Sequence, residues 1–309
     1  MDTTSDWRGR RVLITGATGF IGRCLVDHAL RAQAIVTTLS RKPANLPGVS
    51  KHLTVDIGDR RIILRAIEEL QPEAILHVAA SGVSEATEYS EMLHSNALGT
   101  DNLLSAAKLL KQPPFVVMAG SGYEYGEQTR PLTEDDPICP SSPYGISKVA
   151  ATLCAANHSA HIPITVLRIF NVYGPGERLP RLLPYIVKNA KLGLPVDLTA
   201  CDQVRDFIYV NDLASIFWRA LESAPQKGRL RILNVGSGLA LSLKGFVHLV
   251  MRELERQGIK AQIEFGARPY RSGEPMYYVA NPSRLKEVLG CIPGTSLEVG
   301  VTETVAALA

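Results

Sequence analysis

The stretch RVLITGATGFIG, residues 11–22, decides the fold. Its first part, Arg11–Thr15, is largely apolar and predicts a short buried strand. Glycines spaced GxxGxxG follow at once, and an amphipathic helix is predicted from about Phe20 to Arg31. A strand that turns through glycines into a helix is the first half of a βαβ unit.

The same alternation continues through the first half of the chain. Further strands are predicted at Ala34–Leu39, His52–Val55, Ala74–Val78 and Phe115–Ala119. Helices are predicted at Arg60–Leu70, ending before Gln71-Pro72, and as one long helix at Glu91–Leu110. Strands that alternate with helices predict an α/β protein with a parallel, doubly wound sheet, the Rossmann fold.

After Phe170 the composition changes to short elements separated by loops rich in Gly, Pro and Arg. We therefore expect residues 1–170 to form a dinucleotide-binding domain. Residues 171–309 are expected to form mainly a smaller α/β substrate-binding domain, with some elements returning to the first domain.

Composition narrows the class of protein. The 309 residues are 46% hydrophobic and 20% charged, as in folded globular proteins, and the net charge of +3 is too small to predict nucleic-acid binding. The five cysteines are scattered and unpaired in sequence, so neither a disulfide framework nor a metal site is expected. His158 and His161 are interpreted as the exposed end of a helix. No signal peptide or membrane span is visible, and a cytoplasmic protein is expected.

The glycine turn predicts a site for the pyrophosphate of a dinucleotide. Such a group needs a backbone without obstructing Cβ atoms and free N–H groups at a helix N-terminus. Gly16 would permit the tight turn, Gly19 the close approach of the ligand, and Gly22 close packing of the helix. The remaining turn residues expected at the cofactor are Thr18, Phe20 and Ile21.

The end of the second strand bears on which dinucleotide binds. NAD sites usually carry an acidic residue there for the ribose 2′-hydroxyl, but this strand ends Leu39-Ser40-Arg41-Lys42. Arg41 can pair with a 2′-phosphate, and Ser40 can donate its hydroxyl. We therefore expect NADP(H), with NAD(H) possible; the alternative is that Arg41 and Lys42 only make the loop soluble.

Two residues after the third strand are candidates for the adenine. Asp56 could accept a hydrogen bond from the base, and Ile57 could contact it. Alternatively, Asp56 caps the helix that begins near Asp59.

Tyr144 and Lys148 are the candidate catalytic pair. They stand four residues apart at the start of a helix that Ser142 can cap, so their side chains share one helix face. A nearby ammonium lowers the pKa of a phenol, which makes it a proton donor and acceptor for a carbinol–carbonyl couple. Ser121, at the end of the strand from Phe115, could reach the same substrate oxygen, although a turn serine is the alternative.

Together these motifs resemble the extended short-chain dehydrogenase/reductase family, the NAD(P)-dependent epimerases and dehydratases of nucleotide sugars. The resemblance includes LRIFNVYGPG and VRDFIYVNDLA and covers essentially the whole chain. It implies a Ser121-Tyr144-Lys148 triad, a nucleotide-sugar substrate, and a homodimer built on the helices containing Glu91–Leu110 and Tyr144–Ala160.

The resemblance carries further positions over one at a time. Ala79 and Ala80 match small residues against the cofactor, and Asn96 matches an asparagine that supports the active site. Phe170 and Asn171 match a pair that meets nicotinamide and substrate. The remaining matches are two arginines for the nucleotide diphosphate, Arg205 and Arg271. Ser81, which begins a loop expected to shape the substrate pocket, is a further candidate for substrate binding.

Three reactions are compatible with this scaffold. A 4,6-dehydratase carries an Asp-Glu pair after its catalytic residue, where this chain has Gly122 and Tyr123, so dehydration is disfavoured; Glu124 is expected to point elsewhere. The leading hypothesis is an NADPH-dependent reductase of a nucleotide-linked 4-keto-6-deoxyhexose. The alternatives are a 4-epimerase with tightly held cofactor and a non-catalytic, cofactor-sensing protein.

Overall fold

The computed structural model describes residues 7–82, 87–271 and 274–308. Contacts divide the chain into two compact units. The first runs up to Glu124 and takes in Ser142–Arg168 and Ala214–Leu233; the second contains Tyr125–Ser141, Ile169–Leu213 and the chain from Asn234. Each unit is described by itself below.

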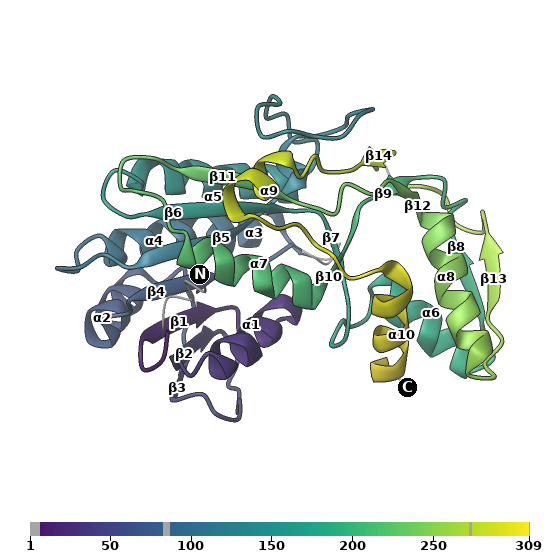
Figure 1. Ribbon diagram of the computed structural model, residues 1–309, viewed down its shortest axis with the longest axis horizontal. Helices are drawn as coiled ribbons and strands as arrows, with labels where there is room; N and C mark the ends of the chain where they lie inside the picture. The colour runs from purple at the N-terminus through teal and green to yellow at the C-terminus, as the bar shows by residue number, and fades with distance from the viewer. Residues whose placement is uncertain (1–6, 83–86, 272–273, 309) are drawn as a thin grey trace. The chain divides into compact units, whose positions relative to one another are not determined.

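The first unit is built on a seven-stranded sheet in the order β11-β6-β5-β4-β1-β2-β3 (Figure 1). The strands are β1 (Arg11–Thr15), β2 (Ile35–Ser40), β3 (Lys51–Thr54), β4 (Ala74–His77), β5 (Phe115–Ser121), β6 (Ile164–Ile169) and β11 (Arg231–Val235). The pairings of β1 with β2 and β4, of β2 with β3, and of β4 with β5 are parallel. The predicted Rossmann-like sheet is confirmed.

Helices cover both faces of this sheet (Figure 1). They are α1 (Phe20–Arg31), α2 (Arg60–Leu70), α3 (Tyr89–Met92), α4 (Gly99–Ala107), α5 (Pro143–His158) and α7 (Val210–Glu222). Helices α2, α4 and α5 pack side by side on one face, over a core that includes Ile63, Leu103 and Ala151. On the other face, Trp7 makes an edge contact with Trp218 of α7 at 5.6 Å, and His28 of α1 packs on the same ring.

The long helix predicted at Glu91–Leu110 is interrupted. Between α3 and α4, residues Leu93–Leu98 form a π-helical segment, η1. Such segments often occur at functional sites, and this one contains Asn96. A three-residue 3₁₀ turn, η2 (Gly122–Glu124), follows β5.

His158 corrects one interpretation. It was expected at an exposed helix end, but its side chain is 2% exposed and its Nε2 lies 2.8 Å from Asp101 Oδ1. The histidine therefore joins α5 to α4, and only His161 is exposed.

The second unit consists of short elements around its own core. Its strands form three small sheets: β7 (Asn171–Tyr173) with β10 (Phe207–Tyr209), β9 (Val204–Arg205) between β12 (Leu241–Ser242) and β14 (Tyr277–Tyr278), and β8 (Pro195–Leu198) with β13 (Gln262–Phe265). Its helices are α6 (Leu182–Lys191), α8 (Leu243–Arg256), α9 (Ser283–Leu289) and α10 (Leu297–Leu308). Aromatic rings fill the core, where Phe207 and Phe246 stack at 4.0 Å.

Membrane-spanning helices and clusters of metal-ligating side chains are considered together. Among the residues that the structure describes, no helix combines the length and apolarity needed to cross a membrane. Within the same residues, no group of three or more His, Cys, Asp or Glu side chains is placed to hold a metal ion.

Candidate active site

A pocket lies where strands β1 to β4 end, in the first unit. It is lined by Gly16, Thr18, Gly19, Leu39, Ser40, Arg41, Lys42, Val55, Ile57, Val78, Ala79, Ala80 and Ser95. The carboxyl ends of parallel strands are where ligands bind in doubly wound folds. Eight of these residues were predicted to contact a cofactor, whereas Phe20, Ile21, Gly22, Asp56, Asn96 and Phe170 do not line the pocket.

The glycine turn forms a close-packed cradle at the bottom of this pocket. Gly16 has φ +70°, and a Cβ there would lie 2.7 Å from the backbone nitrogen of Ala79. A Cβ on Gly22 would lie 2.1 Å from the carbonyl oxygen of Gly16. Gly19 precedes α1 and provides no side-chain cap. The first turn of α1 can therefore bind an anion through its N–H groups, as a dinucleotide pyrophosphate requires.

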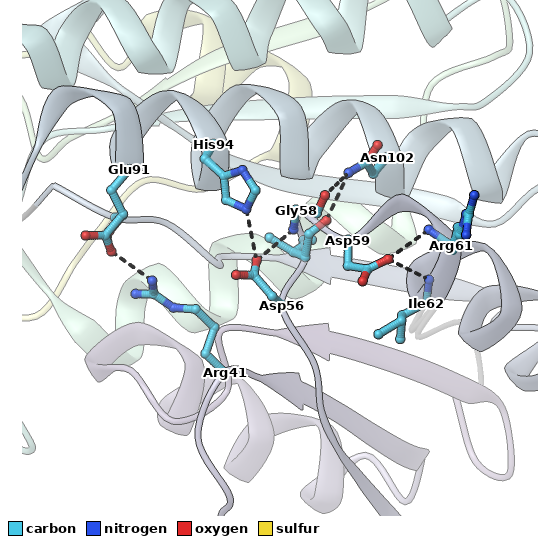
Figure 2. A network of polar contacts seen from close by, with 11 residues as sticks. Arg41, Asp56, Gly58, Asp59, Arg61, Ile62, Glu91, His94 and Asn102 are labelled. Atoms are coloured by element: carbon cyan, nitrogen blue, oxygen red, sulfur yellow. Dashed lines mark hydrogen bonds and ion pairs between the residues drawn. The ribbon is translucent and has the colours of Figure 1, made fainter.

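At the end of β2 the polar side chains are engaged within the protein. Ser40 donates its hydroxyl to the carbonyl oxygen of Lys42 at 2.8 Å, so it closes a turn. Arg41 Nη1 donates to Glu91 Oε1 of α3, also at 2.8 Å (Figure 2). Arg41 lines the pocket as predicted, but it is neither free nor merely solvated.

The loop after β3 shows which groups Asp56 contacts and which residue caps α2. Its Oδ1 accepts the N–H of Gly58 at 2.8 Å and lies 3.6 Å from His94 Nε2 (Figure 2). The cap of α2 is instead Asp59, which accepts the N–H groups of Arg61 and Ile62. Asp56 therefore stabilises the turn, while Ile57 lines the pocket.

His77, at the end of β4, is a buried residue that sequence reasoning missed. Its two ring nitrogens lie 2.6 Å from Thr15 Oγ1 and 2.9 Å from Thr100 Oγ1. Burial, assisted by the charge of Lys148, lowers the pKa of His77 to about 3, so the ring is neutral at pH 7. It joins β1, β4 and α4 beneath the pocket.

Lys148 and Tyr144 lie on α5, which Ser142 caps by accepting the N–H of Gly145. Lys148 Nζ donates to the carbonyl oxygen of Ala119 in β5 at 2.5 Å. Burial lowers the pKa of Lys148 to about 8, and the carboxylate of Glu124 opposes that shift. The ammonium is therefore the main form at neutral pH.

Tyr144 and Ser121 lie at the same end of the sheet. The ring of Tyr144 packs against Gly82, where a Cβ would lie 2.9 Å from Tyr144 Cδ2, and makes an edge contact with Tyr123 at 6.2 Å. Ser121 ends β5, and its Oγ accepts the N–H of Tyr123 at 3.2 Å. The structure thus brings the three predicted catalytic residues onto two adjoining elements, β5 and α5.

Glu124 is fully buried behind this group. Its Oε1 accepts the backbone N–H of Ser121 at 2.9 Å, and its Oε2 accepts from Thr152 Oγ1 at 2.9 Å and from Arg168 Nε at 3.0 Å. Each partner belongs to a different element: β5, α5 and β6 respectively. The carboxylate therefore fixes the strand end that carries Ser121 against the helix that carries Tyr144 and Lys148.

Asn96 performs a similar positioning function from η1. Its Oδ1 accepts the N–H of Ser81, and its Nδ2 donates to the carbonyl oxygen of Ser81 and to Ser147 Oγ. Ser147 in turn donates to the carbonyl oxygen of Tyr144 at 2.7 Å. Asn96 therefore supports the loop after β4 and the start of α5, and is not part of the pocket wall.

The predicted substrate residues of the second unit lie around β7 and β9. Phe170 packs on Tyr278, with ring centroids 4.6 Å apart, and Asn171 Nδ2 is buried without a hydrogen-bond partner among the described residues. Arg205 is nearly buried and donates to Glu274 Oε1 at 2.8 Å. Arg271 is exposed. Ser272 and Gly273, which follow it in the predicted motif, lie outside the described residues.

Known proteins share both the sequence pattern and the fold. The chain is 30% identical to a dTDP-glucose 4,6-dehydratase of Xanthomonas campestris, over 95% of this chain and 91% of that protein. It is 29% identical to UDP-glucuronate 4-epimerase 4 of Arabidopsis thaliana, over 98% of this chain and 76% of that protein. The solved structure of MoeE5 in complex with UDP-glucuronic acid and NAD superimposes with a TM-score of 0.85 at 28% identity, covering 96% and 98% of the two chains.

The model of the NAD dependent epimerase/dehydratase family matches residues 12–236, from the first buried residue of β1 to the residue after β11. That range contains the glycine cradle, Ser121, Tyr144 and Lys148. This chain belongs to the NAD dependent epimerase/dehydratase family.

Proposed function

We propose that this protein is a nucleotide-sugar 4-epimerase that retains NAD(H) through its catalytic cycle. The observation that carries the proposal is the ion pair between Arg41 and Glu91, because it engages the charged side chain that was expected, together with Ser40, to bind a 2′-phosphate. The relatives that act on or bind UDP-glucuronate support the same choice. The proposal favours epimerisation over the 4-keto reduction that the sequence suggested first.

The chemistry of the site residues suits a proton transfer at the hydroxyl oxygen on C4 of the sugar. Tyr144 would take the proton of the 4-hydroxyl and later return it, since a phenol near an ammonium can act in both directions. Lys148, held by Ala119, would stabilise the phenolate charge, and Ser121 would orient the sugar oxygen. The glycine cradle would hold NAD, which when bound supplies a reversible hydride acceptor for that carbon.

The environment of Glu124 argues against a dehydratase. Elimination of water needs an acid and a base near the catalytic triad, and Gly122 and Tyr123 provide neither carboxyl group. Glu124 is fully buried, and both its oxygens are occupied by Ser121, Thr152 and Arg168. It therefore has no oxygen available for a substrate.

A 4-keto reductase is the second candidate. It is favoured by one specific observation, the absence of an acidic residue at the end of β2, where Ser40 is the last residue of the strand and Arg41 follows it. Reductases consume their cofactor in each turnover, whereas epimerases restore it. The two candidates therefore differ in net cofactor balance.

That difference defines the test. Purified protein is incubated with UDP-glucuronic acid or UDP-glucose, with no added reductant, and the products are separated by chromatography. We expect a mixture of C4 epimers with no net change in absorbance at the reduced-nicotinamide band. Tyr144→Phe is expected to lower this rate by about 10²–10⁴-fold. Tyr89→Phe, an exposed tyrosine on α3, is the matched control.

Other outcomes identify other functions. Stoichiometric oxidation of NADPH by a 4-keto nucleotide sugar, without epimerisation, would replace the epimerase by the reductase. A Tyr144→Phe protein with unchanged activity would remove the phenol from the mechanism. Bound cofactor with no turnover of any nucleotide sugar would favour a binding protein.

A further inference from the structure

The carboxylate of Glu91 holds two groups at the edge of the pocket. Its Oε1 accepts from Arg41 Nη1 and from the hydroxyl of Ser81, each at 2.8 Å. Arg41 lines the pocket where β2 ends, and Ser81 follows β4. Glu91 therefore engages the guanidinium that stands nearest the expected position of a ribose 2′-substituent.

The continuous helical stretch that begins with α3 and Glu91 and runs through η1 into α4 is fixed against the loop after β3 (Figure 2). His94 Nε2 lies 3.6 Å from Asp56 Oδ1, and Asn102 Nδ2 donates to the carbonyl oxygen of Gly58 at 2.9 Å. The fit is close, because a Cβ on Gly58 would lie 1.9 Å from His94 Nε2. The packing of η1 and α4 against the loop after β3, in addition to the ion pair, thus keeps Glu91 beside Arg41.

The charges of Glu91 and Arg41 would distinguish a ribose 2′-phosphate from a 2′-hydroxyl. Hydrogen bonds from Arg41 and Ser81 lower the pKa of Glu91, so the side chain is a carboxylate at neutral pH. A 2′-phosphate carries about −1.5 to −2 charges and would have to share Arg41 with this carboxylate or displace it. A ribose 2′-hydroxyl brings no charge, and the existing ion pair can stay in place.

We propose that Glu91 is a specificity-determining residue which, by occupying Arg41, makes the pocket favour dinucleotides with a free ribose 2′-hydroxyl over 2′-phosphorylated ones. The inference rests on the proposed dinucleotide site and is independent of the sugar reaction. An Arg after β2 would then not indicate NADPH use in this chain, because its charge is already compensated from α3.

The test is a competition between cofactors in the absence of sugar. NAD⁺ and NADP⁺ are titrated against each other on the purified protein, and the ratio of their dissociation constants is measured. In Glu91→Gln the amide oxygen can still accept from Ser81 and Arg41, but the negative charge is gone. We expect the variant to improve NADP⁺ binding relative to NAD⁺ by about fivefold, which corresponds to about 1 kcal/mol. Glu88→Gln, an exposed carboxylate three residues earlier, should leave the ratio unchanged.

A double variant tests whether Glu91 acts on cofactor choice through Arg41. If Glu91 acts by occupying Arg41, the effect of Glu91→Gln disappears in an Arg41→Ala background. An equal change in that background, or an unchanged ratio in Glu91→Gln alone, would overturn the proposal. Because no sugar is present, a protein that epimerises nothing can still show the shift, so failure of the proposed reaction is recognised separately.

Discussion

Each unit of the molecule contains a fully buried carboxylate, and the two are stabilised in different ways. Glu124 in the first unit is paired with the guanidinium of Arg168, whose side chain is 4% exposed. Asp206 in the second unit is equally inaccessible, yet the hydrogen bonds that hold it come from neutral donors.

The neutral donors around Asp206 are mostly backbone groups. Oδ1 accepts from the N–H and the hydroxyl of Ser237, and Oδ2 accepts from the N–H groups of Gly238 and Ala280. A Cβ at Gly236 would lie 2.3 Å from Oδ2, so the loop closes tightly over the carboxylate. Burial raises the pKa of Asp206, while these hydrogen bonds act in the opposite direction.

The difference indicates what each carboxylate is for. Glu124 lies next to a lysine that the proposed reaction needs as a cation, and its charge helps to keep that lysine protonated. The ion pair with Arg168 ensures that this buried carboxylate is not left without a compensating charge. Asp206 only has to hold together loops that are distant in sequence, for which several N–H donors are sufficient.

Of the variants considered, removal of the Glu124 carboxylate should lower the free energy of unfolding most. Glu124→Ala takes away the carboxylate that Arg168 pairs with, and breaking a buried pair in this way costs about 3–5 kcal/mol of unfolding free energy. The chain's two tryptophans, Trp7 and Trp218, both lie in the first unit, so urea unfolding followed by their fluorescence reports the loss.

Glu124→Gln is the matched variant for that measurement, since its amide oxygen keeps an acceptor for the N–H of Ser121. It should retain more stability than Glu124→Ala. A loss below about 1 kcal/mol for the alanine variant, as expected of a surface pair, would contradict the buried-pair interpretation.

Replacing Asp206 should have a smaller effect. Asp206→Asn keeps the shape but turns one acceptor into a donor that faces backbone N–H groups, and an unsatisfied buried donor costs about 1–3 kcal/mol. Unfolding followed by far-UV circular dichroism measures the change.

The pH dependence has a definite sign for Asp206. Because the folded pKa is raised above the ordinary 3.8, the native state binds this proton more firmly than the unfolded chain. The contribution to stability is therefore complete below pH 3.8 and is lost as the pH rises through the folded pKa. Asp206→Asn should abolish it; an unaltered pH profile would show that Asp206 does not titrate in this window.

The fold of the first unit could be predicted because its signals are local. The bounds of β1, α1 and α2 agree with the prediction. Each of the signals used (the apolar strand, the glycine turn and the helix end before Gln71-Pro72) depends on only a few consecutive residues. The second unit has strands of two to four residues, such as β9 and β14, which are too short to show a period. Their pairing depends on contacts between distant segments.

In the candidate site too, features that depend on local motifs could be predicted, and features that depend on distant contacts could not. The glycine cradle and the Tyr144–Lys148 spacing are visible in the sequence, because both are local motifs. The partners of Arg41, His77 and Glu124 are not, because the contacts join residues 50, 62 and 44 positions apart. Charge at the end of β2 was therefore interpreted without Glu91.

The smallest predicted effect isolates what the charge of Glu124 adds to a single hydrogen bond. Thr152 donates to Glu124 Oε2 at 2.9 Å, whereas Thr304, which is also buried, in the second unit, donates to the neutral carbonyl oxygen of Gly300 at 2.5 Å. Valine has the shape of threonine, so Thr152→Val and Thr304→Val each remove the hydroxyl without opening a cavity. A hydrogen bond to a charged group contributes about 1.5–3 kcal/mol and one between neutral groups about 0.5–1.5 kcal/mol. We expect Thr152→Val to lose about 1.5 kcal/mol in urea unfolding, and Thr304→Val about half as much. Equal losses would mean that Arg168 already neutralises Glu124 so completely that its oxygen accepts like an ordinary carbonyl.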